Sequence, residues 1–405
     1  MSESAFPIRL SQRMSQLPDY MFEKINLLRQ QLRREGHDLI DMSMGNPKDP
    51  TPKPIVDKLT EAAADPRNHR YSVAAGIINL RTELAKYYAA QYDVQLNPAD
   101  EAICTIGSKE GFSHLTLALL GHGETALVPA PAYPIHSYSV VLAGATPIPL
   151  NVEDDREMLR ALVRLCEQGR PRPKVLFINY PHNPTGKCVE LPFFEEIVAI
   201  ARRFELIVVH DFAYGRLTYD GFRHPSFLEA KGAKEVGLEF GTFSKSYNMA
   251  GWRVGYALGN KDIIKALNRI KGYYDYGIFQ ALQIAAIIAL RHGEPFIAAQ
   301  VEIYRKRRDV VVQGLRQAGW EVEPNRGGMF LWVRIPEPFA AEGSYAFAMR
   351  LLQEAQVVVS PGVGFGPEGE GYVRMALVEN EKRLRQATRG IRQSFGIGEA
   401  LRKAQ

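Results

Sequence analysis

Cysteine is scarce in this chain of 405 residues, and the three cysteines follow no pattern. Cys104, Cys166 and Cys188 are odd in number and far apart, whereas a disulfide framework or a zinc site needs paired or closely spaced cysteines. We therefore expect no disulfide, no metal site and a reducing compartment, the cytoplasm. The first ten residues contain Glu3 and Arg9 and no apolar run, so we expect no export signal.

Long apolar runs and a strong charge of one sign are also missing. The least polar stretch, residues 276–290, contains Gln280 and Gln283 and is shorter than the about 18–20 apolar residues of a membrane span. It predicts a buried helix, with no membrane contact. The 50 Lys and Arg residues exceed the 45 Asp and Glu residues by only five and form no long basic run, so no nucleic-acid partner is expected.

The composition, 46% hydrophobic and 23% charged, is typical of a globular protein with two or three domains. Between about residues 100 and 260, short apolar runs alternate with amphipathic segments, which predicts an α/β domain with a mostly parallel sheet of seven strands covered by helices. The expected strands are residues 102–106, 125–128, 146–150, 175–179, 206–210, 238–243 and 254–258, and the expected helices are 110–120, 156–167, 190–204 and 261–270.

The pattern changes after residue 290. A long helical segment at 294–318 precedes expected strands at 328–335, 357–360 and 372–377 and expected helices at 345–354 and 379–395, which predicts a smaller α+β domain. Prolines forbid regular helix in residues 46–54 and favour extended backbone, so this segment is expected to cross between the domains. We expect a large domain at 47–292 and a small domain formed by 1–46 and 293–405.

Lys245 is the first candidate for chemistry, because it directly follows the expected strand 238–243. Open α/β sheets bind ligands at the carboxyl ends of their strands. A lysine in a desolvated cleft there loses proton affinity and can form a Schiff base with an aldehyde. Pyridoxal phosphate is the aldehyde cofactor that such a site suggests.

Two other strand ends carry polar motifs: Asn183 lies in an Asn-Pro-Thr-Gly turn after strand 175–179, and Asp211 and Tyr214 follow strand 206–210. Together with Ser244-Lys245, an arginine eight residues later and Arg374 in a late strand, these motifs resemble the fold-type I pyridoxal-phosphate enzymes of the class I/II aminotransferase family over almost the whole chain. The resemblance implies an aspartate aminotransferase-like fold.

The resemblance also implies roles around the cofactor ring. Lys245 resembles the lysine that forms the Schiff base and then moves the substrate Cα proton, and Asp211 matches the carboxylate that keeps the pyridine nitrogen protonated. Tyr214 and Asn183 resemble the pair that forms hydrogen bonds with the phenolic oxygen of the cofactor. Tyr133, in Ala-Pro-Ala-Tyr-Pro, matches the aromatic residue that stacks on the ring.

The phosphate group needs N–H donors and a cation. Gly107-Ser108-Lys109 follows strand 102–106 at a helix start, where free amides and the helix dipole bind anions. Ser108 adds a hydroxyl, and Lys109 contributes its backbone N–H. Arg253 suits a bidentate contact with two phosphate oxygens. In the family pattern, Thr242 and Ser244 add further hydroxyls.

Tyr71, in the segment Tyr-Ser-Val-Ala-Ala-Gly, resembles the tyrosine that reaches the phosphate in the neighbouring subunit. The resemblance therefore implies a homodimer with shared active sites.

The substrate site is implied in the same way. Arg374 alternates with apolar neighbours on its strand, and an inward-facing arginine needs an anionic partner. It matches the arginine that holds the substrate α-carboxylate, with Asn183 and the backbone near Gly45 assisting. Tyr20 is a further candidate for the side-chain pocket. The expected substrates are an amino acid and a 2-oxo acid.

The motifs are most similar to those of bacterial alanine transaminases, which implies L-alanine and 2-oxoglutarate as substrates. LL-diaminopimelate, aspartate and methionine aminotransferases are the alternatives. Lys271 falls near the place where aspartate-specific relatives carry an arginine from the partner subunit. Lysine binds a carboxylate with less fixed geometry than arginine does, because it lacks the planar fork of N–H donors. Strict specificity for dicarboxylic substrates is therefore not expected.

Three other functions are considered for this sequence. Residues 364–369 match Gly-x-Gly-x-x-Gly, but Pro367 and the strand expected at 372–377 predict a loop instead of the helix that a dinucleotide site requires. A pyridoxal-phosphate-binding transcription regulator needs a basic DNA-binding domain, for which no segment is expected ahead of residue 46. A pyridoxal-phosphate β-lyase stays possible on this scaffold.

Overall fold

The computed structural model describes residues 8–18 and 22–395. Its main feature is a seven-stranded sheet with the strand order β2-β8-β7-β6-β5-β3-β4, in which only β8 runs antiparallel to its neighbours. All seven strands expected from the sequence are confirmed. They are β2 (Ala102–Thr105), β3 (Thr125–Ala130), β4 (Thr146–Asn151), β5 (Pro173–Asn179), β6 (Ile207–Asp211), β7 (Gly237–Thr242) and β8 (Gly255–Gly259).

Both faces of this sheet are buried in the first core of the molecule, because apolar side chains point alternately to the two faces. In β5, Val175 and Phe177 point to one face, and Leu176 and Ile178 point to the other. Helices α5 (Ser108–Leu119), α6 (Pro134–Leu142) and α11 (Lys261–Tyr274) cover the first face. Helices α4 (Ile78–Tyr92), α7 (Asp155–Gln168), α8 (Leu191–Phe204) and α12 (Gln280–His292) cover the second. Such burial explains the nearly continuous hydrophobic strands.

Two helix boundaries differ from the sequence expectation for a backbone reason. Helix α5 begins at Ser108, two residues earlier than expected, because Gly107 turns the chain at φ 73°. The helix expected at 276–290 begins at Gln280, because Tyr276 and Gly277 have φ of 55° and 90°. Positive φ values end regular helix geometry.

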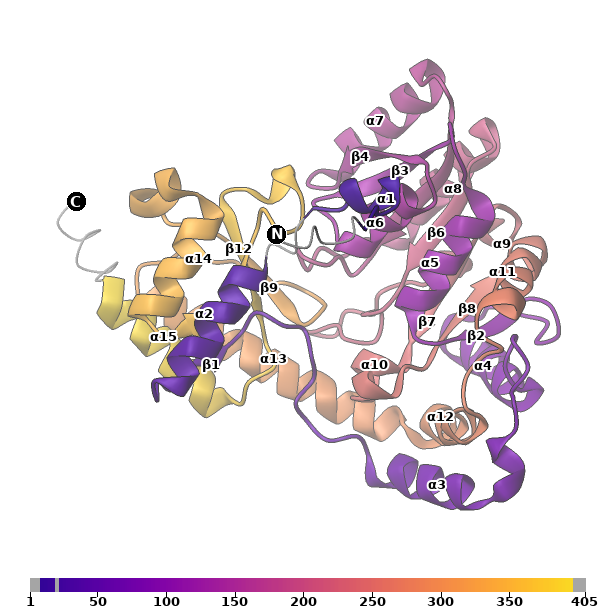
Figure 1. The fold of residues 1–405 in the computed structure, drawn as a ribbon, viewed down its shortest axis with the longest axis horizontal. Helices are drawn as coiled ribbons and strands as arrows, with labels where there is room; N and C mark the ends of the chain where they lie inside the picture. Colours follow the sequence, from indigo (N-terminus) through magenta and orange to yellow (C-terminus); the bar gives the residue numbers. More distant parts are fainter. Residues whose placement is uncertain (1–7, 19–21, 396–405) are drawn as a thin grey trace, which may run out of the picture.

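A second core lies beside the first, at the left of Figure 1, around a three-stranded antiparallel sheet of β11 (Ser360–Pro361), β12 (Tyr372–Ala376) and β9 (Phe330–Arg334). A separate parallel pair joins β1 (Ile40–Asp41) to β10 (Val357–Val358). The single strand expected at 357–360 is therefore divided between two sheets. The domain boundaries at residues 46/47 and 292/293 stay a prediction.

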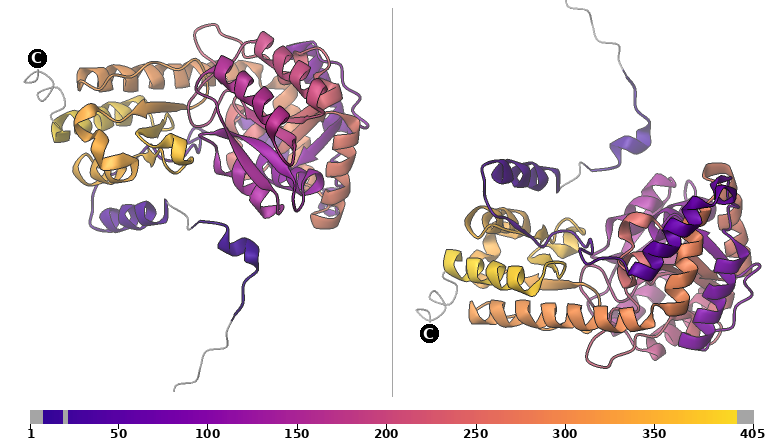
Figure 2. Two further views of the ribbon diagram at one scale, coloured as in Figure 1. Left: turned by 90° about the horizontal axis from the view of Figure 1, so that it is seen from above. Right: turned by 90° about the horizontal axis from the view of Figure 1, so that it is seen from below.

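Helix α13 (Glu294–Gln317) extends from the large sheet along the second core, as both views in Figure 2 show. Helices α14 (Gly343–Glu354) and α15 (Glu381–Phe395) complete this core, and α2 (Phe22–Arg34) lies near α14. The remaining helices are α1 (Gln12–Ser15), α3 (Lys53–Ala64), α9 (Ala233–Val236), α10 (Phe243–Ser246) and the 3₁₀ turns Pro66–His69, Phe227–Glu229, Ala250–Trp252, Glu337–Glu342 and Pro367–Gly369.

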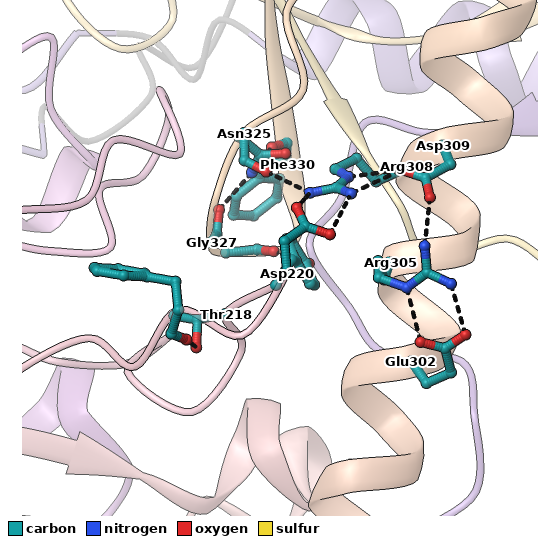
Figure 3. Close-up of polar contacts among 12 residues, drawn as sticks. Thr218, Asp220, Glu302, Arg305, Arg308, Asp309, Asn325, Gly327 and Phe330 are labelled. Atoms are coloured by element: carbon teal, nitrogen blue, oxygen red, sulfur yellow. Dashed lines mark hydrogen bonds and ion pairs between the residues drawn. The ribbon is translucent and has the colours of Figure 1, made fainter.

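An ion pair joins α13 to the segment after β6, and a hydrogen bond joins α13 to the chain that leads into β9 (Figure 3). The buried guanidinium of Arg308 donates to Asp220 Oδ2 at 2.7 Å and Oδ1 at 3.2 Å, and to the carbonyl oxygen of Asn325 at 2.9 Å. The Asn325 amide in turn donates to the carbonyl oxygen of Phe330 at 3.0 Å. This network holds Phe330, which reaches the candidate site described below.

The Gly-x-Gly-x-x-Gly segment at residues 364–369 is a loop between β11 and β12, as expected, and no long helix follows it. Gly362 and Gly369 pack backbone against backbone, since a Cβ at Gly362 would lie 1.9 Å from the carbonyl oxygen of Gly369. The glycines therefore allow a tight loop and form no dinucleotide fingerprint. None of the described helices combines the length and apolar character that a membrane crossing needs.

Candidate active site

A cavity of about 510 Å³ opens at the carboxyl ends of β5, β6 and β7, between the two cores. Of the predicted site residues that the structure describes, all except Tyr71 line this cavity. The lining includes Gly45, Ser108, Lys109, Tyr133, Asn183, Asp211, Tyr214, Thr242, Ser244, Lys245, Arg253 and Arg374. The chain thus brings together residues that are up to 329 positions apart, from Gly45 to Arg374.

Lys245 lies on the short helix α10, which Thr242 begins by accepting a hydrogen bond from Ser244 N at 3.1 Å. Its Nζ donates to the carbonyl oxygen of Gly45 at 2.5 Å. Burial and, secondarily, the positive charges of Arg374 and Arg253 lower the pKa of Lys245 from 10.5 to about 8. Near neutral pH, part of this amine is therefore uncharged and nucleophilic.

Asp211 ends β6 directly opposite Asn179 of β5. Its Oδ2 lies 3.1 Å from His136 Nε2, and its carbonyl oxygen accepts from Asn179 Nδ2 at 2.7 Å. Its Oδ1 is buried and has no hydrogen-bond partner within the described part of the chain. The carboxylate is thus oriented by fixed neighbours and keeps one oxygen available to a donor in the cavity.

The N-terminus of α5 and Arg253 form one surface of the cavity. A Cβ at Gly107 would lie 2.3 Å from Arg253 Nη2, and a Cβ at Gly255 would lie 2.7 Å from Ser108 N. Only glycine at both positions leaves the amide of Ser108 and the guanidinium side by side. Free amides at a helix start and an arginine are the groups that bind a phosphate.

Arg374 of β12 is buried between two aromatic rings, with its guanidinium carbon 4.1 Å from the Phe330 ring centre and 4.5 Å from that of Phe365. It donates to Asn183 Oδ1 at 2.8 Å and to the carbonyl oxygen of Ser43 at 2.7 Å. These contacts hold the guanidinium in place at the wall of the cavity.

Comparison with known proteins places this geometry in a family. The model of the family described as aminotransferase class I and II matches residues 37–391. The chain belongs to this family. It is similar to the glutamate-pyruvate aminotransferase AlaC of Escherichia coli (49% identical; 96% of this chain and 94% of the relative covered) and to the LL-diaminopimelate aminotransferase of Moorella thermoacetica (41%; 95% and 98%). Among solved structures it resembles apo-BacF of Bacillus subtilis, with 33% identity, a TM-score of 0.89 and coverage of 97% and 100%.

The chain is therefore an aminotransferase with the aspartate aminotransferase-like fold, as the sequence motifs predicted. Enzymes of this family use pyridoxal phosphate and take amino acids and 2-oxo acids as substrates. The cavity fits that cofactor in three respects: the glycine-lined surface at Ser108 and Arg253, the buried Asp211 Oδ1 and the low pKa of the Lys245 amine.

One described residue of the predicted site, Tyr71, does not line the cavity. Tyr71 is 92% exposed, its ring 5.6 Å from that of Tyr276 on the surface of the chain. Its predicted contact is with a partner subunit and stays a prediction. Tyr20 lies outside the described residues.

Lys271, expected near the position where aspartate-specific relatives carry a carboxylate-binding arginine, does not line the cavity. Its side chain is fully buried, and Nζ lies 3.0 Å from both Glu110 Oε1 and Asp275 Oδ2 of the same chain. Because two carboxylates already hold this ammonium away from solvent, it is not accessible to a substrate.

Sequence reasoning missed several contacts of the site. Asn179 ends a buried strand, as Asp211 does, and this polar strand end was a usable signal. His136 follows Ile135 in α6, and nothing local distinguishes it from a core histidine. Phe330 and Phe365 look like ordinary strand and loop residues until β9 and the loop after β11 are seen beside Arg374.

Proposed function

We propose that this chain transfers the amino group of L-alanine to 2-oxoglutarate with pyridoxal phosphate bound in the cavity. The observation that carries the proposal is that Lys245, Asp211 and Arg374 line one cavity. A nucleophilic amine, an oriented carboxylate and a buried guanidinium are the three groups that an amino-acid transamination needs. When bound, pyridoxal phosphate supplies an aldehyde for the amine and a ring that accepts electrons from the substrate Cα.

In this proposal the residues of the chain bind and orient. The Ser108 amide, the hydroxyls of Ser108, Thr242 and Ser244, the Lys109 backbone N–H and Arg253 bind the phosphate. Asp211 Oδ1 holds a proton on the ring nitrogen, and Tyr133 stacks on the ring. Burial raises the pKa of Tyr214 well above its usual range, so the hydroxyl of Tyr214 stays protonated. This hydroxyl donates a hydrogen bond to the phenolic oxygen of the cofactor. Asn183 donates to that oxygen too, because its Oδ1 is engaged by Arg374 and its Nδ2 remains a donor.

The substrate is bound through its α-carboxylate. Arg374 holds this group bidentately, and Asn183 and the backbone at Gly45 border the same space. Lys245 Nζ takes the proton from the substrate Cα, and its pKa of about 8 suits a general base at neutral pH.

The similarity to AlaC supports L-alanine as the donor. The burial of Lys271 prevents it from pairing with a distal carboxylate, which argues against strict specificity for dicarboxylic substrates and still allows 2-oxoglutarate to enter as the acceptor. The relatives that are LL-diaminopimelate aminotransferases support the runner-up, a longer donor accepted by the same machinery.

We propose further that the sites are completed in a homodimer, with Tyr71 reaching the phosphate of the partner. The support is that the exposed ring of Tyr71 lies 5.6 Å from the exposed ring of Tyr276, between two segments rich in exposed large apolar side chains. Such side chains are common at interaction surfaces when they gather. Within residues 71–78 and 273–279, the exposed fractions are Tyr71 (92%), Val73 (61%), Ile78 (49%), Tyr273 (86%), Tyr274 (63%), Tyr276 (61%) and Phe279 (40%).

A donor screen with 2-oxoglutarate as acceptor tests the substrate. Alanine, aspartate, methionine and LL-diaminopimelate are compared, with Lys245→Ala as the blank. We expect kcat/KM for alanine to exceed the others at least about tenfold. A kcat/KM for LL-diaminopimelate or aspartate that exceeds the others by this factor would overturn L-alanine as the proposed donor. Release of ammonia from a β-substituted amino acid, without any 2-oxo acid present, would indicate a β-lyase instead.

A further inference from the structure

Four ionisable side chains form a cluster beneath the N-terminus of α5, outside the proposed cavity. Glu110 and His114 lie one turn apart on α5, and Lys271 and Asp275 come from the end of α11, which packs against α5. Lys271 Nζ lies 3.0 Å from Glu110 Oε1 and 3.0 Å from Asp275 Oδ2, and His114 Nδ1 contacts the same Glu110 oxygen. None of the four has a role in the proposed reaction.

Glu110 links this cluster to the proposed phosphate site. Its Oε2 accepts a hydrogen bond from Ile106 N at 2.7 Å, directly before Gly107 and Ser108. Although burial raises the pKa of Glu110, the hydrogen bond from His114, the charge of Lys271 and the Ile106 amide outweigh it and lower this pKa below its usual value. The carboxylate is therefore charged, and it holds the backbone at the point where α5 begins.

A negative charge at this position opposes the binding of an anion. Glu110 lies in the first turn of α5, two residues after Ser108, so its charge repels a phosphate at the helix start unless a cation offsets it. Lys271 supplies that cation in a fully buried position, where solvent does not screen it.

The same residues do not form a metal site. Ligand atoms of Glu110, His114 and Asp275 lie within 4.8 Å of one another. However, the ammonium of Lys271 already donates to both carboxylates. It occupies the position that a metal ion would need.

We propose that Lys271 is a positioning residue for the phosphate group. Its ammonium offsets the charge of Glu110, so that this carboxylate orders the start of α5 without repelling the anion bound there. The inference rests on the proposed binding of pyridoxal phosphate at Ser108 and Arg253. It assigns the lysine to cofactor affinity and not to substrate choice.

The test measures cofactor affinity instead of turnover. Apoenzyme is titrated with pyridoxal phosphate and, separately, with pyridoxal, which lacks the phosphate, and absorbance reports binding. The dissociation constant of pyridoxal divided by that of pyridoxal phosphate isolates the contribution of the phosphate. For Lys271→Met we expect this ratio to fall at least about tenfold, because Glu110 is left without its counter-charge.

The double variant Glu110→Gln/Lys271→Met separates charge from packing. It removes the charges of Glu110 and Lys271 and leaves that of Asp275, while the amide oxygen introduced at position 110 can still accept from Ile106 N. We expect the double variant to recover part of the ratio that the single variant loses, because the carboxylate nearer to the phosphate is gone. If the ratio in Lys271→Met equals that of the wild type, or if the double variant loses as much as the single one, the inference is overturned.

Two controls complete the design. Glu239→Gln disturbs a buried charge elsewhere in the large sheet, so it controls for loss of stability without a change of ratio. Lys271→Gln replaces the methionine variant if that chain does not fold, and the same ratio decides. A wild-type apoenzyme that binds pyridoxal as tightly as pyridoxal phosphate would contradict the proposed function itself, which distinguishes that failure from a failure of the inference.

Discussion

The ring of Phe365 lies against the guanidinium of Arg374, with 4.5 Å between the ring centre and the guanidinium carbon. The carbonyl oxygen of Phe365 also accepts a hydrogen bond from Ala132 N at 2.7 Å, next to Tyr133. One residue of the loop after β11 therefore contacts both the proposed carboxylate site and the segment that carries the proposed stacking ring.

The first prediction concerns this contact. Phe365→Leu removes a cation–π partner that is largely desolvated, which corresponds to about 1 kcal/mol, or about a fivefold rise in KM for the amino donor. Phe365→Tyr keeps the ring and should behave like the wild type. The matched control is Phe339→Leu, which removes a ring that does not line the cavity. The centre of that ring lies 5.7 Å from the guanidinium carbon of Arg350. Equal KM values for Phe365→Leu and the wild type would contradict the role.

The second prediction follows from the pKa of Lys245. A decrease from 10.5 to about 8 means that the folded apoenzyme disfavours the charged amine by about 3 kcal/mol, at about 1.4 kcal/mol per pKa unit. Below pH 8 the folded and unfolded chains both bind this proton, and the full cost is present. Between pH 8 and 10.5 only the unfolded chain binds it, so this lysine's contribution to stability rises with pH.

Lys245→Met should therefore stabilise the apoenzyme at pH 7 by up to about 3 kcal/mol, and the difference from the wild type should shrink toward pH 10. Urea unfolding of both apoenzymes at the two pH values measures it. Lys265→Met, at an exposed lysine, should change stability little at either pH. A gap between Lys245→Met and the wild type that stays constant with pH would show that the gain comes from packing alone.

The third prediction concerns a buried network in the large sheet. Glu239 accepts from Tyr88 Oη at 2.7 Å, Ser226 Oγ at 2.8 Å and Phe227 N at 2.8 Å, and pairs with His210 Nδ1 at 2.8 Å. Glu239→Gln brings amide hydrogens toward these donors and should lower the free energy of unfolding by about 2–3 kcal/mol. Urea unfolding checks this, with the exposed Glu195→Gln as control. A loss below that of the control would mean that the network does not need its charge.

The fourth prediction tests the shared site. Tyr71→Ala and Lys245→Ala should each be nearly inactive. Mixing and reassembling the two should restore up to about one quarter of the wild-type activity, because half of the dimers are hybrids with one intact site. A mixture that stays as inactive as its components would contradict the contribution of Tyr71 to the partner's site.

The positions of Asp211, Asn183 and Lys245 could be predicted from sequence, because each follows a strand whose apolar run is visible locally. Parallel strands place their carboxyl ends at one edge of the sheet, so local pattern implied proximity. The same reasoning could have included Asn179. It could not include His136, whose partner is 75 residues away.

The environment of Lys271 could not be predicted from the sequence. The sequence places it near the position of a carboxylate-binding arginine in aspartate-specific relatives, and it is buried between Glu110 and Asp275. Pairing with Glu110 depends on the packing of α11 against α5, which brings together residues 161 positions apart. Burial of a charge is decided by such packing and not by the neighbours in the chain.

By itself, the sequence determined the alternation of strands and helices, the strand-end residues and the family, because these depend on local periodicity and short motifs. The tertiary structure alone decided which distant groups meet. Phe330 and Phe365 enclose Arg374, Gly45 accepts from Lys245, and Lys271 offsets Glu110, because contacts across long stretches of chain form only when the two cores and their helices pack together.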